Sequence, residues 1–217
     1  MTAETRTERS LSSASNEYVW DVPGEAGSHS YLLPAVTAEL ARAGARKVLD
    51  LGCGNGTLTA RLQQEGYDMT GVDHSSSGIA LAKRQYPGIA FDRHDLHDEL
   101  PAAHTGRYDA VVAVEVIEHL LLPRRLMAAA TAALRPGGAF IVTTPYHGYL
   151  KNLALALAGS FDEHWAPLRD YGHVKFFSRR TLTQLFVEFG YRDIVFRTVG
   201  RVPPLAKSMV VTGVKPG

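Results

Sequence analysis

The sequence predicts an α/β fold in which a mostly parallel sheet of about seven strands is covered by helices on both faces. Three observations lead to this fold class. From Lys47 onward, short β-rich runs alternate with runs of helical periodicity. Several β-rich runs are almost continuously apolar, as strands are when both faces of a sheet are buried. The chain has 217 residues, 45% of them hydrophobic, which suits one domain with a sizeable core.

The strands are expected in two groups. Five are separated by helical segments: Lys47–Leu51, Asp68–Asp73, Ile89–Arg93, Tyr108–Val114 and Ala139–Thr143. Two close the sheet and are joined through Val202-Pro203-Pro204: Tyr191–Val199 and Ser208–Val214.

Five segments are expected to be helices, one before the first strand and four between strands. They are Tyr31–Ala43, Thr57–Glu65, Gly78–Gln85, Arg124–Leu134 and Arg179–Phe189. Ser178 is a plausible N-cap for the last of them, and Arg135-Pro136-Gly137-Gly138 is a stop signal for the fourth.

Residues 1–28 are expected to form a flexible leader, and residues 29–217 a single domain. Within that domain, Pro145–Gly172 fits no strand–helix unit, so a lid or binding loop and plain scaffolding are equally good interpretations. The leader lacks the apolar run of a signal peptide, and no segment is long enough to cross a bilayer. With Cys53 as the only cysteine, these features favour a cytoplasmic protein.

A glycine-rich turn follows the first expected strand, in Asp50-Leu51-Gly52-Cys53-Gly54-Asn55-Gly56. Glycines let the backbone turn tightly and approach a ligand, and the next helix offers unpaired N–H groups. Asp73, at the end of the following strand, suits the two hydroxyls of a ribose. A tight βα connection and a dinucleotide site are the alternatives. The Gly-x-Gly-x-Gly spacing, however, lacks the wider final spacing of the dinucleotide fingerprint.

From Lys47 to Val214 the sequence resembles the class I S-adenosylmethionine methyltransferases. The resemblance rests on the Asp50–Gly56 turn, Asp73, Asp95-Leu96 and the Leu134–Gly138 turn, in that order. It implies a Rossmann-like sheet and S-adenosylmethionine as cofactor. The turn would hold the methionine part, Asp73 the ribose and Asp95 the adenine amino group. The candidate cofactor-binding residues are Asp50, Gly52, Cys53, Gly54, Asp73, His74, Asp95, Leu96 and Glu115.

Catalytic residues are expected just beyond the fourth strand, in Glu115-Val116-Ile117-Glu118-His119. In one interpretation Glu115 supports the cofactor, and Glu118 and His119 are catalytic, with His119 as the general base. In the other, the i, i+3, i+4 spacing of Glu115, Glu118 and His119 places all three on one side of a helical turn. Carboxylates and an imidazole together suit Mg²⁺, Mn²⁺ or Zn²⁺.

The Glu-x-x-Glu-His pattern is similar to that of the ubiquinone-pathway O-methyltransferases and the small-RNA 2′-O-methyltransferases. In the latter, these residues and a distant histidine hold a divalent metal. That resemblance implies His173, in Gly172-His173-Val174-Lys175, as a fourth ligand. The alternative is that His119 caps a helix and His173 is a loop residue near the substrate.

The favoured function is methyl transfer to a hydroxyl of a small molecule, with a catechol or vicinal diol suiting a metal-assisted reaction. Aromatic and polar residues of the insertion suit such an acceptor: Tyr146, His147, Tyr149, His164, Trp165 and Tyr171. Leu150–Leu157 is an apolar lid or a peripheral membrane contact. For Trp20 and Tyr31, packing is favoured over a place in the pocket.

The competing functions are an RNA methyltransferase, an N-methyltransferase and a binding protein that does not catalyse transfer. A formal net charge of +1 and scattered basic pairs argue against nucleic acid. Intact Glu118 and His119 argue against a sensor, which needs no proton acceptor. The sequence leaves the oligomeric state open.

Overall fold

The computed structural model describes residues 19–20, 27–165, 167–168, 170–203 and 205–217. Most of the predicted leader therefore lies outside the described residues, and the division into a leader and one domain stays a prediction. Among the helices that are described, none combines the length and apolar composition needed to span a bilayer.

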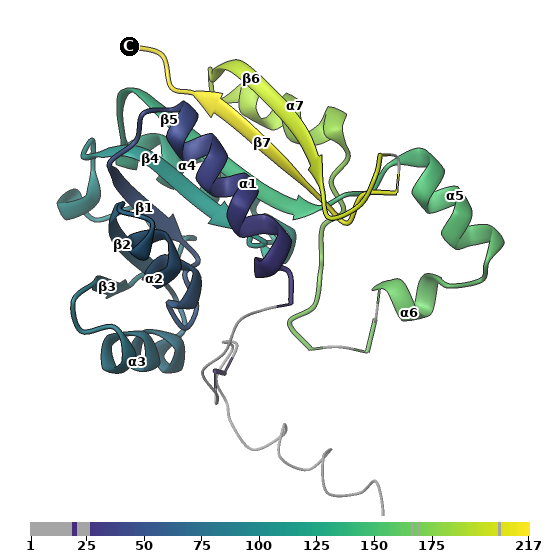
Figure 1. Cartoon of the computed structure of the whole chain (residues 1–217), viewed down its shortest axis with the longest axis horizontal. Coiled ribbons are helices and arrows are strands. Elements are labelled where there is room, and N and C mark those ends of the chain that lie inside the picture. The colour runs from purple at the N-terminus through teal and green to yellow at the C-terminus, as the bar shows by residue number, and fades with distance from the viewer. Residues whose placement is uncertain (1–18, 21–26, 166, 169, 204) are drawn as a thin grey trace, which may run out of the picture.

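One seven-stranded sheet forms the centre of the molecule (Figure 1). Its order is β3 (Ala90–Arg93), β2 (Asp68–Asp73), β1 (Lys47–Leu51), β4 (Tyr108–Val114), β5 (Leu134–Pro145), β7 (Ser208–Val214) and β6 (Arg192–Val199). Only β7 runs antiparallel to its neighbours. This confirms the predicted mostly parallel sheet with two closing strands.

Helices cover both faces of the sheet, as predicted. The apolar sides of α1 (His29–Arg42) and α2 (Thr57–Gln64) form one core cluster with the strands. On the other face, α4 (Pro123–Ala133) and α7 (Arg179–Glu188) bury leucines against β4, β5 and β7. Burial of these side chains on both sides explains the continuous apolar strands. α3 (Ser76–Gln85) packs beside β2 and β3.

Two of the element boundaries that differ from the sequence prediction have a clear local cause. α4 ends at Ala133, and Leu134 opens β5, where it pairs with Tyr108 before a bulge. Leu134 is fully buried, so core packing draws it into the sheet instead of leaving it on the helix. α3 begins at Ser76, two residues before the predicted start, because the side chain of Ser75 accepts a hydrogen bond from Gly78 N.

The 145–172 insertion contains two short helices, α5 (Tyr149–Leu157) and α6 (Phe161–Trp165). They project beyond the end of β5 and stand apart from the sheet (Figure 1). Neither helix has a buried residue. The two helices therefore have no side that faces a core, and for that reason the pattern of this segment did not predict a helix.

Candidate active site

The glycine-rich turn has a backbone that only glycine adopts easily. Gly52, Gly54 and Gly56 have φ angles of 84°, 54° and 76°. An added Cβ at Gly52 would stand 2.5 Å from Cγ2 of Val116, which follows β4. The turn and the residues after β4 are therefore in direct contact, because β1 and β4 are parallel neighbours that end at the same edge of the sheet.

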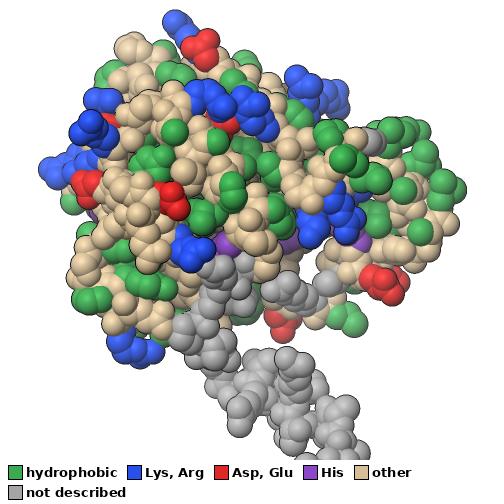
Figure 2. Space-filling view, in the orientation of Figure 1, with side chains coloured by type: hydrophobic (Ala, Val, Ile, Leu, Met, Phe, Trp, Pro, Cys, Tyr) green, Lys and Arg blue, Asp and Glu red, His purple; other side chains and the backbone are tan. Residues whose placement is uncertain are grey.

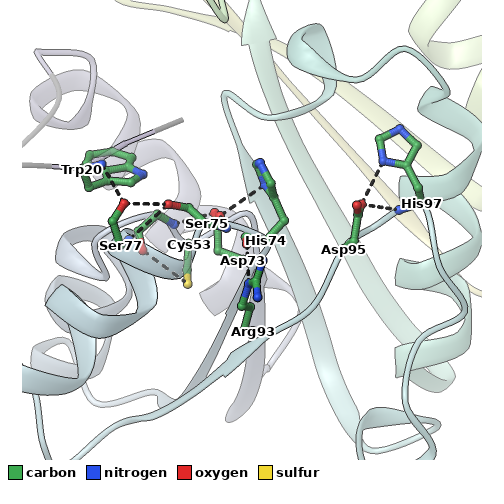
Figure 3. Close-up of polar contacts among 11 residues, drawn as sticks. Trp20, Cys53, Asp73, His74, Ser75, Ser77, Arg93, Asp95 and His97 are labelled. Atoms are coloured by element: carbon green, nitrogen blue, oxygen red, sulfur yellow. Dashed lines mark hydrogen bonds and ion pairs between the residues drawn. The ribbon is translucent and has the colours of Figure 1, made fainter. Parts of the chain in front are cut away.

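Asp73 ties the turn to the start of α3. Its carboxylate accepts hydrogen bonds from Gly54 N and Ser75 N, each at 2.8 Å, and Nδ1 of His74 lies 3.5 Å from one of its oxygens (Figure 3). The side chain is 11% exposed, so the carboxylate reaches the edge of the predicted cofactor site. The structure thus brings Asp73 and His74 to the glycine turn.

Asp50 and Cys53, in contrast, lie beneath the turn. Asp50 is 1% exposed and accepts a 2.7 Å hydrogen bond from the Thr59 hydroxyl. Burial is the main cause that raises its pKa from 3.8 to about 7, and the Asp73 charge adds to it. The Cys53 thiol packs with Phe91 in a small core cluster, and burial raises its pKa. Both predicted cofactor residues therefore shape the turn from within.

Trp20 covers the turn from outside. A Cβ at Gly54 would stand 2.5 Å from Cζ2 of the indole, and one at Gly78 would stand 2.9 Å from Cδ1. The Trp20 backbone N–H donates to Oγ of Ser77 at 2.9 Å (Figure 3). The indole packs, as the sequence favoured, but it packs on the predicted cofactor site.

Asp95 lies across from Asp73 and His74 (Figure 3). It accepts hydrogen bonds from N and Nδ1 of His97 at 2.9 and 2.8 Å, and the backbone bond is the main cause that lowers its pKa. About half of its side chain, 52%, is exposed and accessible to a ligand. The neighbouring Leu96 is buried in the main core, so its contribution to an adenine pocket is limited to its backbone and edge.

Glu115, the first residue after β4, has a left-handed backbone with φ of 55°. The strain of this conformation is held by hydrogen bonds from its N–H to O and Oγ1 of Thr143. Its carboxylate accepts a 3.0 Å hydrogen bond from the same Thr143 hydroxyl. The left-handed turn breaks the helical spacing assumed from the sequence, because only Ile117–His119 form a short 3₁₀ helix, η3.

Glu118, His119 and His173 come together in one cluster. Each offers one ligand atom, and these atoms lie within 4.8 Å of one another. The amides of Val174 and Lys175 donate to the Glu118 carbonyl at 2.9 and 3.0 Å, which anchors the distant segment beside η3. The predicted four-ligand set therefore becomes a three-residue cluster, and Glu115 is not part of it.

Backbone carbonyls orient the His119 ring, and the Glu118 carboxylate beside it is buried. Nδ1 of His119 lies 3.0 and 3.2 Å from the carbonyls of Tyr171 and Gly172. Carbonyls only accept hydrogen bonds, so Nδ1 carries the hydrogen and the Nε2 lone pair is the one that can bind a metal or a proton. Neither carboxylate oxygen of the buried Glu118 has a hydrogen-bond partner among the described residues. Burial, with the nearby Glu115 charge, raises the pKa of Glu118 well above its usual range.

A cavity of about 600 Å³ opens beside this cluster. His173 lines it, as does Glu115, so the cluster and the cavity share a wall. The insertion forms much of the rest: Pro145, His147, Lys151, Ala154, Leu155, Ala158, His164 and Trp165. The predicted candidate lid is thus the wall of a pocket of ligand size.

Tyr31 lines the cavity from α1, although the sequence favoured packing over a place in the pocket for this residue. Its hydroxyl lies 3.3 Å from Oγ of Ser208. Ser208, Arg201 and Lys207 line the cavity from the β6–β7 connection and the start of β7, and the sequence analysis did not single them out. No local pattern could have paired Tyr31 with Ser208, because 177 positions separate them.

A family model described as a methyltransferase domain matches residues 28–195. The ubiquinone biosynthesis O-methyltransferase of Psychrobacter cryohalolentis is 30% identical over 169 residues, covering 73% of this chain and 64% of that protein. The Escherichia coli O157:H7 protein of the same name is 33% identical over 149 residues, covering 65% and 61%. The chain therefore spans somewhat less than two thirds of the length of these relatives.

Solved structures share the fold. The methyltransferase domain of bacterial CtHen1-CN superposes with a TM-score of 0.62 at 25% identity, covering 84% of this chain and 97% of that one. Magnesium protoporphyrin IX methyltransferase from Synechocystis gives a TM-score of 0.63 at 19% identity, covering 85% and 82%. The second likeness shows the fold alone.

Proposed function

The chain belongs to the methyltransferase-domain family, and from that premise we propose that it transfers a methyl group from S-adenosylmethionine to a hydroxyl of a small molecule. One observation carries the choice of a hydroxyl acceptor. His173 belongs both to the Glu118–His119–His173 cluster and to the wall of the cavity. A group that takes a proton or binds an oxygen therefore faces the space in which an acceptor would lie. The curated relatives, which are O-methyltransferases by name, support the same choice.

The glycine turn supports the cofactor part of the proposal. When bound, S-adenosylmethionine supplies a methyl group on a sulfonium sulfur, which an acceptor lone pair displaces in line. Gly52 and Gly54 let the turn pack closely against Val116 and Trp20, and Asp73 brings acceptor oxygens to the edge of the turn. Glu115 follows β4 on the same edge of the sheet and lines the cavity. Burial raises the pKa of its carboxyl group to about 7, and in its ionised form it would place a negative charge near the sulfonium.

The hydroxyl proton has two candidate routes. In the first, a divalent cation, when bound, lowers the pKa of the acceptor hydroxyl and fixes its lone pair. The donor set fits such an ion, because the imidazoles of His119 and His173 and the carboxylate of Glu118 each offer a ligand atom, and these atoms lie within 4.8 Å of one another. In the second, Nε2 of His119 takes the proton directly, with Nδ1 held by the two backbone carbonyls.

Methyl transfer from labelled S-adenosylmethionine to catechol and to phenol tests the proposal. The assay is run with Mg²⁺, Mn²⁺, Zn²⁺ or chelator on the wild type, His173→Ala and Val174→Ala. The last is the matched control, since its side chain is outside the cluster while its backbone keeps the bond to Glu118. A metal-dependent preference for catechol that is lost only in His173→Ala supports the cation. Activity that survives chelator but is lost in His119→Gln assigns the proton to His119.

The proposal has a clear failing result. S-Adenosylhomocysteine binds only a folded cofactor site, so it should raise the melting temperature of the wild type. If it does not, the cofactor assignment is wrong. If it does and no hydroxyl acceptor is methylated while an amine is, the O-methyl assignment is wrong.

A further inference from the structure

Three cationic side chains surround the cavity, and they come from two parts of the chain. Lys151 lies on α5, and Arg201 and Lys207 lie in the connection between β6 and β7. Glu115 is the sole carboxylate among the residues that line the cavity in the described part of the chain. The three cations form no ion pair with any carboxylate of those residues. The cavity therefore has an excess of positive charge.

Lys151 is held in the cavity wall by its own contacts. Its Nζ donates a 3.0 Å hydrogen bond to the carbonyl of Tyr146, and the residue is partly buried. Burial is the main cause that lowers its pKa, the charge of Arg201 lowers it further, and the charge of Glu115 opposes both. A solvated surface lysine would show neither feature. The Lys151 ammonium group thus lies in a partly buried position, where an unpaired charge lowers the stability of the fold.

The histidines and the other cations around Lys151 also show that positive charge is concentrated at the cavity. Burial and the charge of Lys151 together lower the pKa of His164 and lower that of His147 to about 4. Lys207 extends over the ring of Tyr31, with Nζ 5.2 Å from the ring centroid. Lys and Arg side chains border the hollow between the body of the molecule and the projecting helices (Figure 2). An anion in the cavity would relieve the repulsion among these groups.

Part of the remaining wall is apolar. Ala154, Leu155, Trp165 and Leu205 line the cavity beside the cations. A ligand that fits both surfaces has an anionic group and an apolar or aromatic body. The volume of about 600 Å³ suits a small molecule and leaves no room for a folded macromolecule.

We propose that the methyl acceptor is an anionic small molecule whose carboxylate or phosphate binds among Lys151, Arg201 and Lys207 while its hydroxyl faces His173. This inference rests on the proposed function, because it assigns the same cavity to the acceptor. It narrows the acceptor from any phenol or diol to one with a negative charge at the end distant from the reacting hydroxyl.

Three catechols that differ only in a charged or neutral substituent distinguish the effect of the negative charge on binding from that of the catechol itself. The probes are 3,4-dihydroxybenzoate, its phosphonate analogue 3,4-dihydroxyphenylphosphonate, and the neutral 3,4-dihydroxybenzamide. Binding of each to the complex with S-adenosylhomocysteine is measured by calorimetry, and methyl transfer by kcat/KM. The variants are Lys151→Met and Arg201→Met. Lys83→Met, an exposed lysine on α3, is the control.

We expect the wild type to bind an anionic probe about tenfold more tightly than the amide, as charge-assisted hydrogen bonds allow. Lys151→Met and Arg201→Met should each remove most of that preference, and Lys83→Met should keep it. The relative affinity of the carboxylate and phosphonate probes identifies which anion the cavity takes. S-Adenosylhomocysteine affinity should be the same in all four proteins, which excludes misfolding as the cause.

Several results overturn the inference. These are equal affinity for acid and amide, no binding of any probe, or unchanged preference in both cavity variants. Tighter binding of a short single-stranded RNA than of the acids, lost in the same variants, would replace the small molecule by a nucleic acid. The proposed function fails separately. If the acids bind through Lys151 but receive no methyl group, the anion site stands and O-methylation of these hydroxyls does not.

Discussion

The two sides of this site are built in opposite ways. On the cofactor side, formed by the glycine turn, Asp73 and the start of α3, polar atoms bond within the protein and glycines pack against Val116 and Trp20. On the acceptor side, formed by the cavity and the Glu118–His119–His173 cluster, a buried carboxylate lacks a hydrogen-bond partner among the described residues and three cations lack an ion pair there. If the proposed function holds, the cofactor side has its polar interactions in place before a ligand arrives, whereas on the acceptor side the ligand would supply the missing interactions.

This difference has an energetic meaning. Groups that are buried without partners cost stability, and a fold keeps them only where a ligand supplies the missing interactions. Substitutions on the cofactor side should therefore lower both stability and cofactor affinity. Substitutions on the acceptor side should change metal or acceptor binding while stability holds or rises. The following predictions test that contrast, from the largest expected effect to the smallest.

Gly52→Ala should have the largest effect. The residue has φ of 84°, and a Cβ would stand 2.5 Å from the Val116 side chain, so the turn must move. We expect about a hundredfold loss of S-adenosylhomocysteine affinity and a fall of about 2 kcal/mol in the free energy of unfolding. Calorimetry and urea unfolding measure the two quantities. Gly88→Ala, where a Cβ has open space, is the control. A variant that keeps full affinity would show that the turn is not the cofactor site.

Glu118→Gln tests the opposite behaviour on the acceptor side. The buried carboxylate has a pKa raised by burial, so its ionised form destabilises the fold without a cation. We expect the variant to melt at the same temperature as the wild type or higher in chelator, and to lose about tenfold or more of its Mn²⁺ affinity. S-Adenosylhomocysteine affinity should not change. Lower stability in chelator would mean that Glu118 has a structural role, and the contrast between the two sides would fail.

The sequence predicted the two sides unequally, for a physical reason. The cofactor side consists of a contiguous turn and Asp73, which ends the next strand. Because these residues are near one another in the chain, their spacing in the sequence predicts that they are close in the fold. The acceptor side joins Tyr31, Glu115, His173 and Arg201, which only the tertiary fold brings together. Of these residues, His173 was proposed from the sequence through a family resemblance.

Errors in the sequence prediction have local causes as well. The helical spacing expected for Glu115, Glu118 and His119 fails because Glu115 adopts a left-handed conformation held by Thr143, a residue of another strand. In the sequence, Lys151 is an isolated charge within the apolar segment Leu150–Leu157. Lys151 lines the cavity because of the direction in which α5 runs. The sequence does not indicate that direction, because α5 has no buried face.

Asp50→Asn tests whether the buried Asp50 carboxyl group on the cofactor side is protonated in the folded protein. Burial raises the pKa of Asp50 from 3.8 to about 7, so protonated Asp50 is favoured in the fold. Its contribution to stability is full below its unfolded pKa and is lost as the pH rises through about 7. The melting temperature of Asp50→Asn should therefore fall less between pH 5 and pH 8, by about a few degrees. Asp162→Asn, exposed on α6, is the control. Equal pH dependence in all three proteins would show that Asp50 stays ionised.

The smallest effect is expected on α5, and it is the sharpest test of the acceptor side. Leu157 is 82% exposed and α5 has no buried residue, so Leu157→Ser should change the free energy of unfolding by less than about 0.5 kcal/mol. The fully buried Leu182 on α7 gives the contrast, since Leu182→Ala should cost about 2 to 5 kcal/mol.

Leu155 separates stability from binding on the same helix. It lines the cavity, whereas Leu157 does not, so Leu155→Ser should weaken binding of the anionic catechols and leave the unfolding free energy unchanged. Leu157→Ser should change neither quantity. If both variants unfold more easily, α5 packs as part of the fold and the acceptor side is as complete as the cofactor side. If only Leu155→Ser weakens binding, the apolar face of α5 binds the acceptor. Packing could not account for that face, because its residues would contribute too little to the free energy of unfolding.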